Sequence, residues 1–173
     1  MRIIFRLVLL AAVAGLGYWL WTVFFPSPEK VIRARLTELA RTASFGSGDS
    51  PIARGLKAQR LANHFTPDAQ LSFEAPGIGS RTLTGAEEIR QTAAAGFHSL
   101  SSLRIKFLDV TVQLDADPRT AEVRLTAEIR ADGSEDYGVQ ELLFKFQRVD
   151  GKWLINRVET VRTLSRAATP RPS

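Results

Sequence analysis

The pattern of apolar and polar residues near the C-terminus predicts two antiparallel strands between Gly138 and Leu164. The dipeptide Asp150-Gly151 separates them and is a strong signal for a two-residue hairpin turn. Because a two-residue turn fixes the register, opposite residues can be paired along the hairpin. The expected pairs are Val149 with Lys152, Arg148 with Trp153, Phe146 with Ile155, Phe144 with Arg157, and Leu142 with Glu159.

One face of this hairpin is apolar and is expected to form part of a core. Its residues are Leu142, Phe144, Phe146, Trp153, Ile155 and Val161. In this register Arg157 and Glu159 lie on the same face, where a charge must be paired or hydrated. The alternatives are a structural ion pair, or a bulge that turns both side chains to solvent. The opposite face is more apolar than solvent contact requires, which suggests pairing of two copies through Val139, Leu143, Leu154 and Val158.

Upstream, apolar residues recur at helical spacing in three segments. The first helix begins at Pro28 and extends to about Phe45, with its apolar face formed by Ile32, Leu36, Leu39 and Ala40. The second begins at Ser50-Pro51 and extends to about Phe65, and its inward residues are Ile52, Leu56 and Phe65. The third opens with the capping box from Thr84 to Glu87, and its inward residues are Ile89, Ala93 and Phe97.

Further strands follow a period of two. Ala69 to Glu74 is expected to be a short strand after a turn at Thr66-Pro67-Asp68, and Arg81 to Leu83 a second one. From Leu103 the apolar residues change face between Phe107 and Leu108, which predicts a β-bulge at that point. A further half-buried strand contains Ala121, Val123, Leu125, Ala127 and Ile129. Three helices followed by long antiparallel strands indicate an α+β domain with helices on one face of a curved sheet.

The N-terminus contains an apolar run from Leu7 to Phe25 without a charged residue. As a helix these 19 residues would be about 28 Å long, close to the hydrocarbon core of a bilayer. A cleaved signal peptide and a buried core helix are alternatives, but an uncleaved transmembrane anchor is favoured. Arg2 and Arg6 favour a cytoplasmic N-terminus, which would place the domain outside the cytosol, in the periplasm of a bacterium. The expected division is an anchor at 1–26, a domain at 27–164 and a disordered tail at 165–173.

Composition narrows the possible chemistry. The chain has no cysteine, which excludes disulfides, thiolate metal sites and a cysteine nucleophile. The net charge of +5 arises from basic residues interspersed with acidic ones, so we expect no nucleic-acid binding. The two histidines are far apart in sequence and no ligand motif surrounds them, so no metal site is expected. Phosphate-binding and dinucleotide-binding motifs are absent from the sequence, and no cofactor is expected.

Five short motifs occur in a characteristic order. They are His64-Phe65-Thr66-Pro67-Asp68-Ala69, Phe73-Glu74-Ala75-Pro76, Leu83-Thr84-Gly85-Ala86-Glu87-Glu88-Ile89, Phe107-Leu108-Asp109-Val110 and Asp150-Gly151-Lys152-Trp153-Leu154-Ile155. With this order and spacing, the region from Pro28 to Leu164 resembles the nuclear transport factor 2-like superfamily, which includes ketosteroid isomerase and polyketide cyclases. The resemblance implies a cone, in which the sheet curls around a pocket closed by the helices. It is specific for fold and not for function.

The resemblance also suggests site residues. The implied pocket lining is Phe73, Glu74, Leu142, Phe144, Phe146, Trp153, Ile155, Arg157 and Glu159. Glu74 lies near the position of the general base in ketosteroid isomerases, and the other candidate acid–base groups are Asp109 and His64. The alternatives are a solvent-exposed strand-end carboxylate for Glu74 and a helix C-terminal cap for His64.

Two function classes follow from this pattern. The favoured one is a membrane-anchored, non-catalytic domain that binds a small apolar ligand or a protein partner outside the cytosol. The alternative is a small lyase, isomerase or cyclase that uses Glu74 or Asp109 as a general base. The expected partners are the lipid bilayer, through Leu7 to Phe25, and a second copy of the chain.

Overall fold

Helices and strands fill most of the part of the chain that the computed structural model describes, residues 15, 27–75, 79–132 and 138–164. The helices are α2 (Pro28–Ala43), α3 (Pro51–Ala62) and α4 (Ala86–Ser99). The strands are β1 (Phe65–Ala75), β2 (Gly79–Thr84), β3 (Leu103–Leu114), β4 (Thr120–Ala131), β5 (Gly138–Val149) and β6 (Lys152–Leu164).

The expected anchor, residues 7–25, lies outside the described residues apart from Gly15, and so does the expected tail at 165–173. Among the residues that are described, no helix is long and apolar enough to cross a bilayer. The anchor therefore stays a prediction from sequence.

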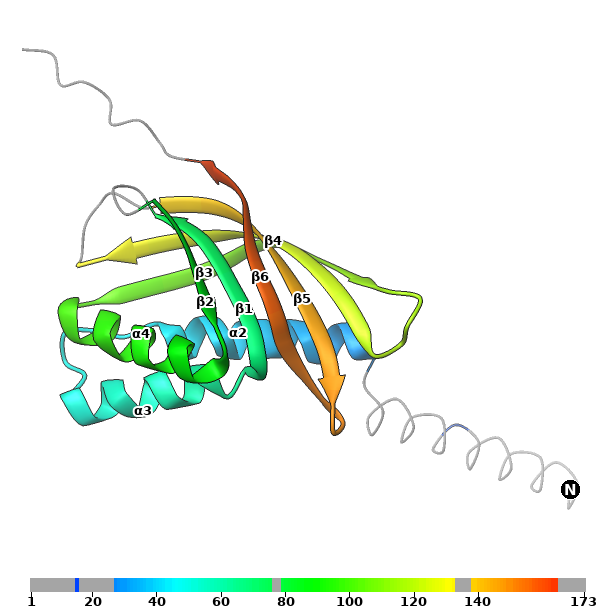
Figure 1. Cartoon of the computed structure of the whole chain (residues 1–173), viewed down its shortest axis with the longest axis horizontal. Helices are drawn as coiled ribbons and strands as arrows, with labels where there is room; N and C mark the ends of the chain where they lie inside the picture. The colour runs from blue at the N-terminus through cyan, green and yellow to red at the C-terminus, as the bar shows by residue number, and fades with distance from the viewer. Residues whose placement is uncertain (1–14, 16–26, 76–78, 133–137, 165–173) are drawn as a thin grey trace, which may run out of the picture.

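The six strands form one sheet in the order β2-β1-β6-β5-β4-β3. All neighbours are antiparallel except β1 and β6, which are parallel. The three helices lie on one side of the sheet (Figure 1). We call the sheet face toward the helices the inner face and the opposite one the outer face. The expected α+β architecture, with three helices on a curved mixed sheet, is confirmed.

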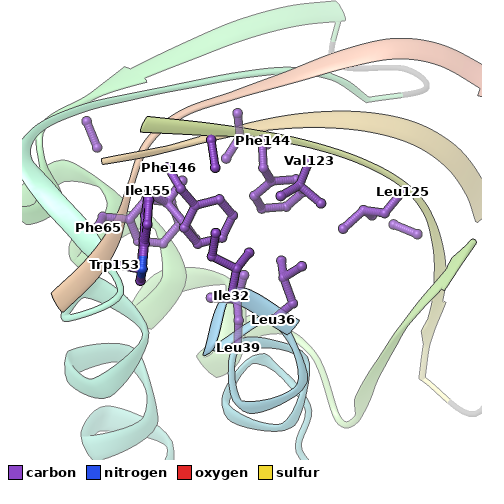
Figure 2. Close-up of a cluster of buried hydrophobic side chains, with 14 of the residues drawn as sticks. Ile32, Leu36, Leu39, Phe65, Val123, Leu125, Phe144, Phe146, Trp153 and Ile155 are labelled. Atoms are coloured by element: carbon purple, nitrogen blue, oxygen red, sulfur yellow. The ribbon is translucent and has the colours of Figure 1, made fainter. Parts of the chain in front are cut away.

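The core lies between α2 and the inner face of the sheet. Figure 2 shows Ile32, Leu36 and Leu39 of α2 beneath side chains of β4, β5 and β6, and all of these residues are less than 9 % exposed. This stripe is the one that the helical spacing of the sequence predicted. Pro28 starts the helix because its fixed φ and missing N–H suit the first turn.

The second helix differs from the expectation in its orientation. Ile52 and Leu56, expected to face inward, are 78 % and 55 % exposed, whereas Ala58 and Ala62 are buried. Ala58 packs with Phe45 and Phe97, so α3 uses small side chains to lie against α4. The helix also ends at Ala62, and the expected turn at Thr66-Pro67-Asp68 is instead part of β1.

The hairpin at Asp150-Gly151 forms as predicted. Both residues have positive φ, 48° and 78°, as a type I′ turn requires. The register agrees with the prediction from the turn to the pair Phe146–Ile155. Beyond this pair, Asn156 is an extra residue on β6, and the next pairs are Lys145–Arg157 and Phe144–Val158. A bulge therefore exchanges the two faces of β6 from this point up to a second irregularity after Thr160.

The predicted bulge in β3 is also present. Leu108 pairs with Thr126 and Thr111 with Arg124, so Asp109 and Val110 lie opposite one residue of β4. Asp109 has φ 52°, a left-handed conformation that aspartate tolerates better than most side chains.

Candidate functional site

Most of the apolar residues expected to line a pocket are core residues. Phe144, Phe146, Trp153 and Ile155 are 2–3 % exposed and belong to the cluster that covers α2. Phe73 and Leu142, farther along the inner face, are half-buried and pack against the same cluster. The side chain of Glu74 is outside the described part of the structure, and its backbone pairs with Ser80 at the end of β1.

The prediction that Arg157 and Glu159 point inward is wrong. The bulge at Asn156 turns both to the outer face, where Arg157 Nε lies 2.7 Å from Glu159 Oε1. Their side chains are 47 % and 38 % exposed, so the pair is hydrated. The same bulge turns Val158, expected on the outer face, into the core at 4 % exposure. A second irregularity in the pairing follows Thr160, and Val161, expected in the core, is 62 % exposed.

The structure does not bring His64 and Asp109 together. His64 follows α3, is 6 % exposed, and its backbone oxygen accepts a hydrogen bond from Ile155 N on β6. Burial lowers the pKa of His64, Glu38 opposes this shift, and Arg35 adds to it, so the imidazole is held neutral. Asp109 is exposed on the far side of the sheet. These two residues therefore cannot act on one substrate as an acid–base pair.

A candidate site among the described residues is a hollow on the outer face, at the bulge of β3. Its volume is about 480 Å³, and its lining residues are Asp109, Arg124, Leu125, Thr126, Glu141, Leu142, Leu143 and Val161. The cross-strand pairs Arg124–Leu143 and Thr126–Glu141 form its floor. Asp109 bounds it on the β3 side and Val161 on the β6 side, and each lies at an irregularity in strand pairing.

The lining combines apolar surface with the carboxylates of Asp109 and Glu141, which have no partner among the described residues. Arg124 is engaged, since its Nη2 lies 3.1 Å from Glu122 Oε1. No hydrogen bond or ion pair to the carboxylates of Asp109 and Glu141 is found within the described ranges of the chain. The hollow can therefore hold an apolar group and offer an acceptor at its rim.

The sequence pointed to only part of this site. Asp109 was a candidate because the change of face after Phe107 predicts a bulge, and bulges re-aim side chains. Arg124, Glu141 and Leu143 were not predicted, because their strands alternate as ordinary half-buried strands do. Val161 was placed in the core, since nothing in the local pattern marks the irregularity beside it.

In ranges 27–75, 79–132 and 138–164, no three His, Asp or Glu side chains lie close enough together to hold an ion.

A comparison with protein-family models matches residues 55–159, more than half of the chain, to the SnoaL-like domain. This chain belongs to the SnoaL-like family. A search of curated proteins found no match.

Solved structures agree with this SnoaL-like fold. An NTF2-like protein with a cystatin-like fold from Novosphingobium aromaticivorans superposes with a TM-score of 0.61 at 17 % identity, over 85 % of this chain and 87 % of that one. The yeast UBP3-associated protein BRE5 gives a TM-score of 0.63 at 15 % identity, over 82 % and 100 %. A domain of unknown function from Nostoc punctiforme gives 0.61 at 18 %, over 82 % and 80 %. At these identities the likeness shows the fold alone.

Proposed function

We propose that this SnoaL-like chain is a non-catalytic binding domain that takes a small apolar ligand in the hollow on the outer face of its sheet. The observation that carries the proposal is the lining of that hollow, in which Leu143 and Val161 lie beside carboxylates that have no partner in the described part of the chain. Exposed apolar surface of this kind is costly in water, and a ligand that covers it gains about 25 cal/mol per Å².

The proposal includes attachment to a membrane through residues 7–25, with the domain outside the cytosol. It is supported by the uncharged run of 19 residues and by Arg2 and Arg6 before it. Because α2 begins at Pro28, the domain would start immediately after the bilayer.

A neutral fluorescent probe, N-phenyl-1-naphthylamine, tests the ligand class. The domain is produced as residues 27–164, and its cooperative unfolding is checked first. We expect saturable binding that Leu143→Gln weakens by about tenfold or more, because a leucine contact is worth about 1.5–3 kcal/mol. The matched control is Leu154→Gln, which changes a half-buried outer-face leucine that does not line the hollow. Equal binding by wild type and Leu143→Gln would refute the proposal.

A second candidate function is suggested by Asp109 and Glu141, which line the same hollow. A carboxylate beside an apolar surface can serve as the general base of a lyase, isomerase or cyclase, which removes a proton from a bound ligand, and this hollow has two. The two functions differ in the fate of the ligand. Recovery of a bound ligand unchanged by mass spectrometry supports the binding domain. Conversion that Asp109→Asn abolishes, with binding retained, supports the enzyme.

A further inference from the structure

Strand β3 is an edge of the sheet, and the described residues cover only part of it. Backbone groups that point away from β4 can be identified from the bonds they make. Leu103 exchanges two hydrogen bonds with Phe45, at 2.8 and 3.0 Å. Ile105 N donates to the Ser44 hydroxyl at 3.0 Å. Along a strand, the backbone N–H and C=O groups of successive residues point alternately to one side and to the other. Leu103, Ile105 and Phe107 therefore direct these groups toward the free edge.

The bulge at Asp109 shifts this alternation by one residue. Arg33 Nη1 donates to Val110 O at 2.8 Å, so Val110 points to the free edge. Asp115 N donates to Thr120 O of the neighbouring hairpin strand, so Asp115 points the other way. The residues between them with edge-facing backbone groups are therefore Val112 and Leu114. No hydrogen bond to these edge-facing groups is found within the described residues.

The uncovered part of the edge also lacks the usual protection against pairing. Edge strands are commonly blocked by charges or proline, and the first half of β3 carries Arg104 and Lys106. The segment 110–114, Val-Thr-Val-Gln-Leu, has no charge and is rich in β-branched residues. Leu114 is 46 % exposed. Such a segment is complementary to a copy of itself.

We infer that β3 pairs with β3 of a second copy of this chain, antiparallel and with the two-fold axis at Gln113. In this register Val112 of each copy faces Leu114 of the other, and the two pairs exchange four backbone hydrogen bonds. The bond from Arg33 to Val110 is kept. Thr111 faces Asp115 of the second copy, so no like charges are opposed. The two sheets become continuous. This contact is separate from the proposed ligand hollow and does not depend on it.

Cross-linking tests the register, because the chain has no cysteine of its own. The full-length protein carries Gln113→Cys, and a mild oxidant is added at tens of micromolar protein, a range in which weak interfaces form. At the axis the two Cα atoms would be about 4.5 Å apart, within disulfide range. We expect a disulfide-linked dimer that forms about tenfold faster, or more, than for Gln59→Cys on the exposed face of α3.

Two further variants distinguish pairing from random collision. In the inferred register, Thr111 of one copy lies about 13 Å from Thr111 of the other, so Thr111→Cys should cross-link no faster than Gln59→Cys. Val112→Pro in the Gln113→Cys background removes an edge N–H without removing a bond to β4, and should abolish the cross-link. Leu143→Lys, on the outer face, should leave it unchanged.

The inference is overturned if the Gln113→Cys protein cross-links no faster than the Gln59→Cys protein, or if the Thr111→Cys protein cross-links as fast as the Gln113→Cys protein. Should Val112→Pro fail to fold by circular dichroism, the comparison of the three cysteine positions still decides, since none of them is buried.

Discussion

His64 is the buried titratable residue with the clearest consequence for stability. It is 6 % exposed at the junction of α3 and β1, and burial holds its pKa below the usual 6.5. The unfolded chain therefore binds a proton at a higher pH than the folded one does. As pH falls below about 6.5, protonation favours the unfolded state, and the folded protein loses stability.

Removing this imidazole should remove that pH dependence. Between pH 7.5 and 5.5 we expect the free energy of unfolding in urea to decrease for wild type. For His64→Gln it should differ from wild type by an amount of its own but should change little with pH. His98→Gln, at an exposed position of α4, should behave as wild type. Carboxyl groups whose pKa is lowered in the folded protein, such as Glu87 with a pKa of about 2, change the stability only below about pH 4.5. They therefore do not contribute between pH 7.5 and 5.5. An unchanged pH dependence in His64→Gln would show that another group is responsible.

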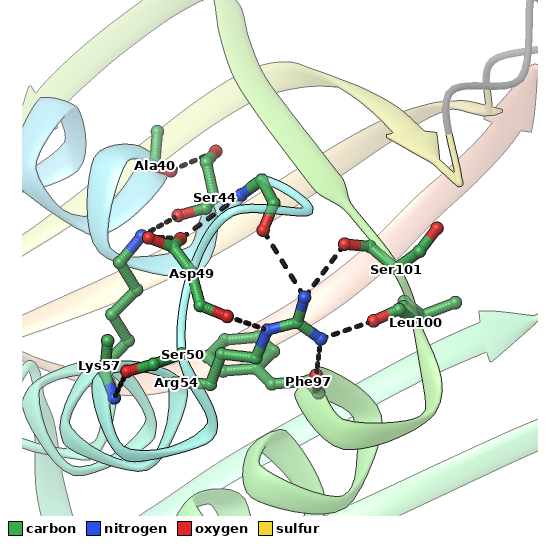
Figure 3. A network of polar contacts seen from close by, with 11 residues as sticks. Ala40, Ser44, Asp49, Ser50, Arg54, Lys57, Phe97, Leu100 and Ser101 are labelled. Atoms are coloured by element: carbon green, nitrogen blue, oxygen red, sulfur yellow. Dashed lines mark hydrogen bonds and ion pairs between the residues drawn. The ribbon is translucent and has the colours of Figure 1, made fainter.

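At the scale of elements, Arg54 connects α3 to the two segments beside it. Figure 3 shows its guanidinium within a ring of backbone carbonyls. All five N–H groups are used: Nε donates to Asp49, Nη1 to Phe97 and Leu100, and Nη2 to Gly46 and Ser101. The guanidinium carbon also lies 4.7 Å from the centre of the Phe45 ring. Arg54 thus satisfies carbonyls at the end of α4, where a cation is favoured.

Replacing Arg54 should destabilise the domain. Arg54→Met keeps much of the chain volume and leaves several partly buried carbonyls without donors, so we expect a loss of about 2–4 kcal/mol in the free energy of unfolding. Arg60→Met, on the same helix and exposed, should change it by less than about 0.5 kcal/mol. Arg54→Lys should recover only part of the loss, because an ammonium has three donors. Similar values for Arg54→Met and Arg60→Met would contradict this role.

At the scale of the whole molecule, the domain is expected to be independent of the N-terminal run. The stripe of α2 is covered by the sheet, so no described element needs residues 1–26 to bury its core. Residues 27–164 alone should therefore unfold in a single cooperative transition. A molten or aggregated product would place the domain boundary elsewhere.

The full-length chain should behave differently from the domain. We expect it to stay with membranes after a carbonate wash, because a span of 19 apolar residues is not extracted by high pH. Protease added outside spheroplasts should digest the domain if the N-terminus is cytoplasmic. Recovery of the full-length chain in the soluble fraction would reject the anchor.

The second copy expected from sequence would bind through the outer face, and this stays a prediction. Of the residues proposed for it, Leu143 and Leu154 are half-buried on that face, whereas Val158 is in the core. Sedimentation of wild type and Leu143→Lys measures this contact, and Gln113→Cys cross-linking measures the one at β3, so the two can be separated.

The sequence alone determined the features that depend on near neighbours in the chain. Asp150-Gly151 specified its turn because both residues tolerate positive φ, and the stripe of α2 followed from helical spacing. The bulge after Phe107 was visible because apolar residues change face there. In each case the chemistry that decides the structure lies within a few residues.

Tertiary structure decided what depends on packing between distant segments. A bulge near Arg157 and Glu159 was only one of the alternatives that the sequence left open, and packing decided for it: the bulge at Asn156 moves both charges outward and Val158 inward. A pair of charges is more stable in water than in a core, so β6 is expected to accept a local irregularity in order to expose them. Likewise, α3 buries Ala58 rather than Leu56, because Ala58 is on the side of the helix that packs against Phe45 and Phe97. The outer hollow lies between two irregularities in strand pairing, at Asp109 of β3 and at Val161 of β6, which the fold brings to the same face.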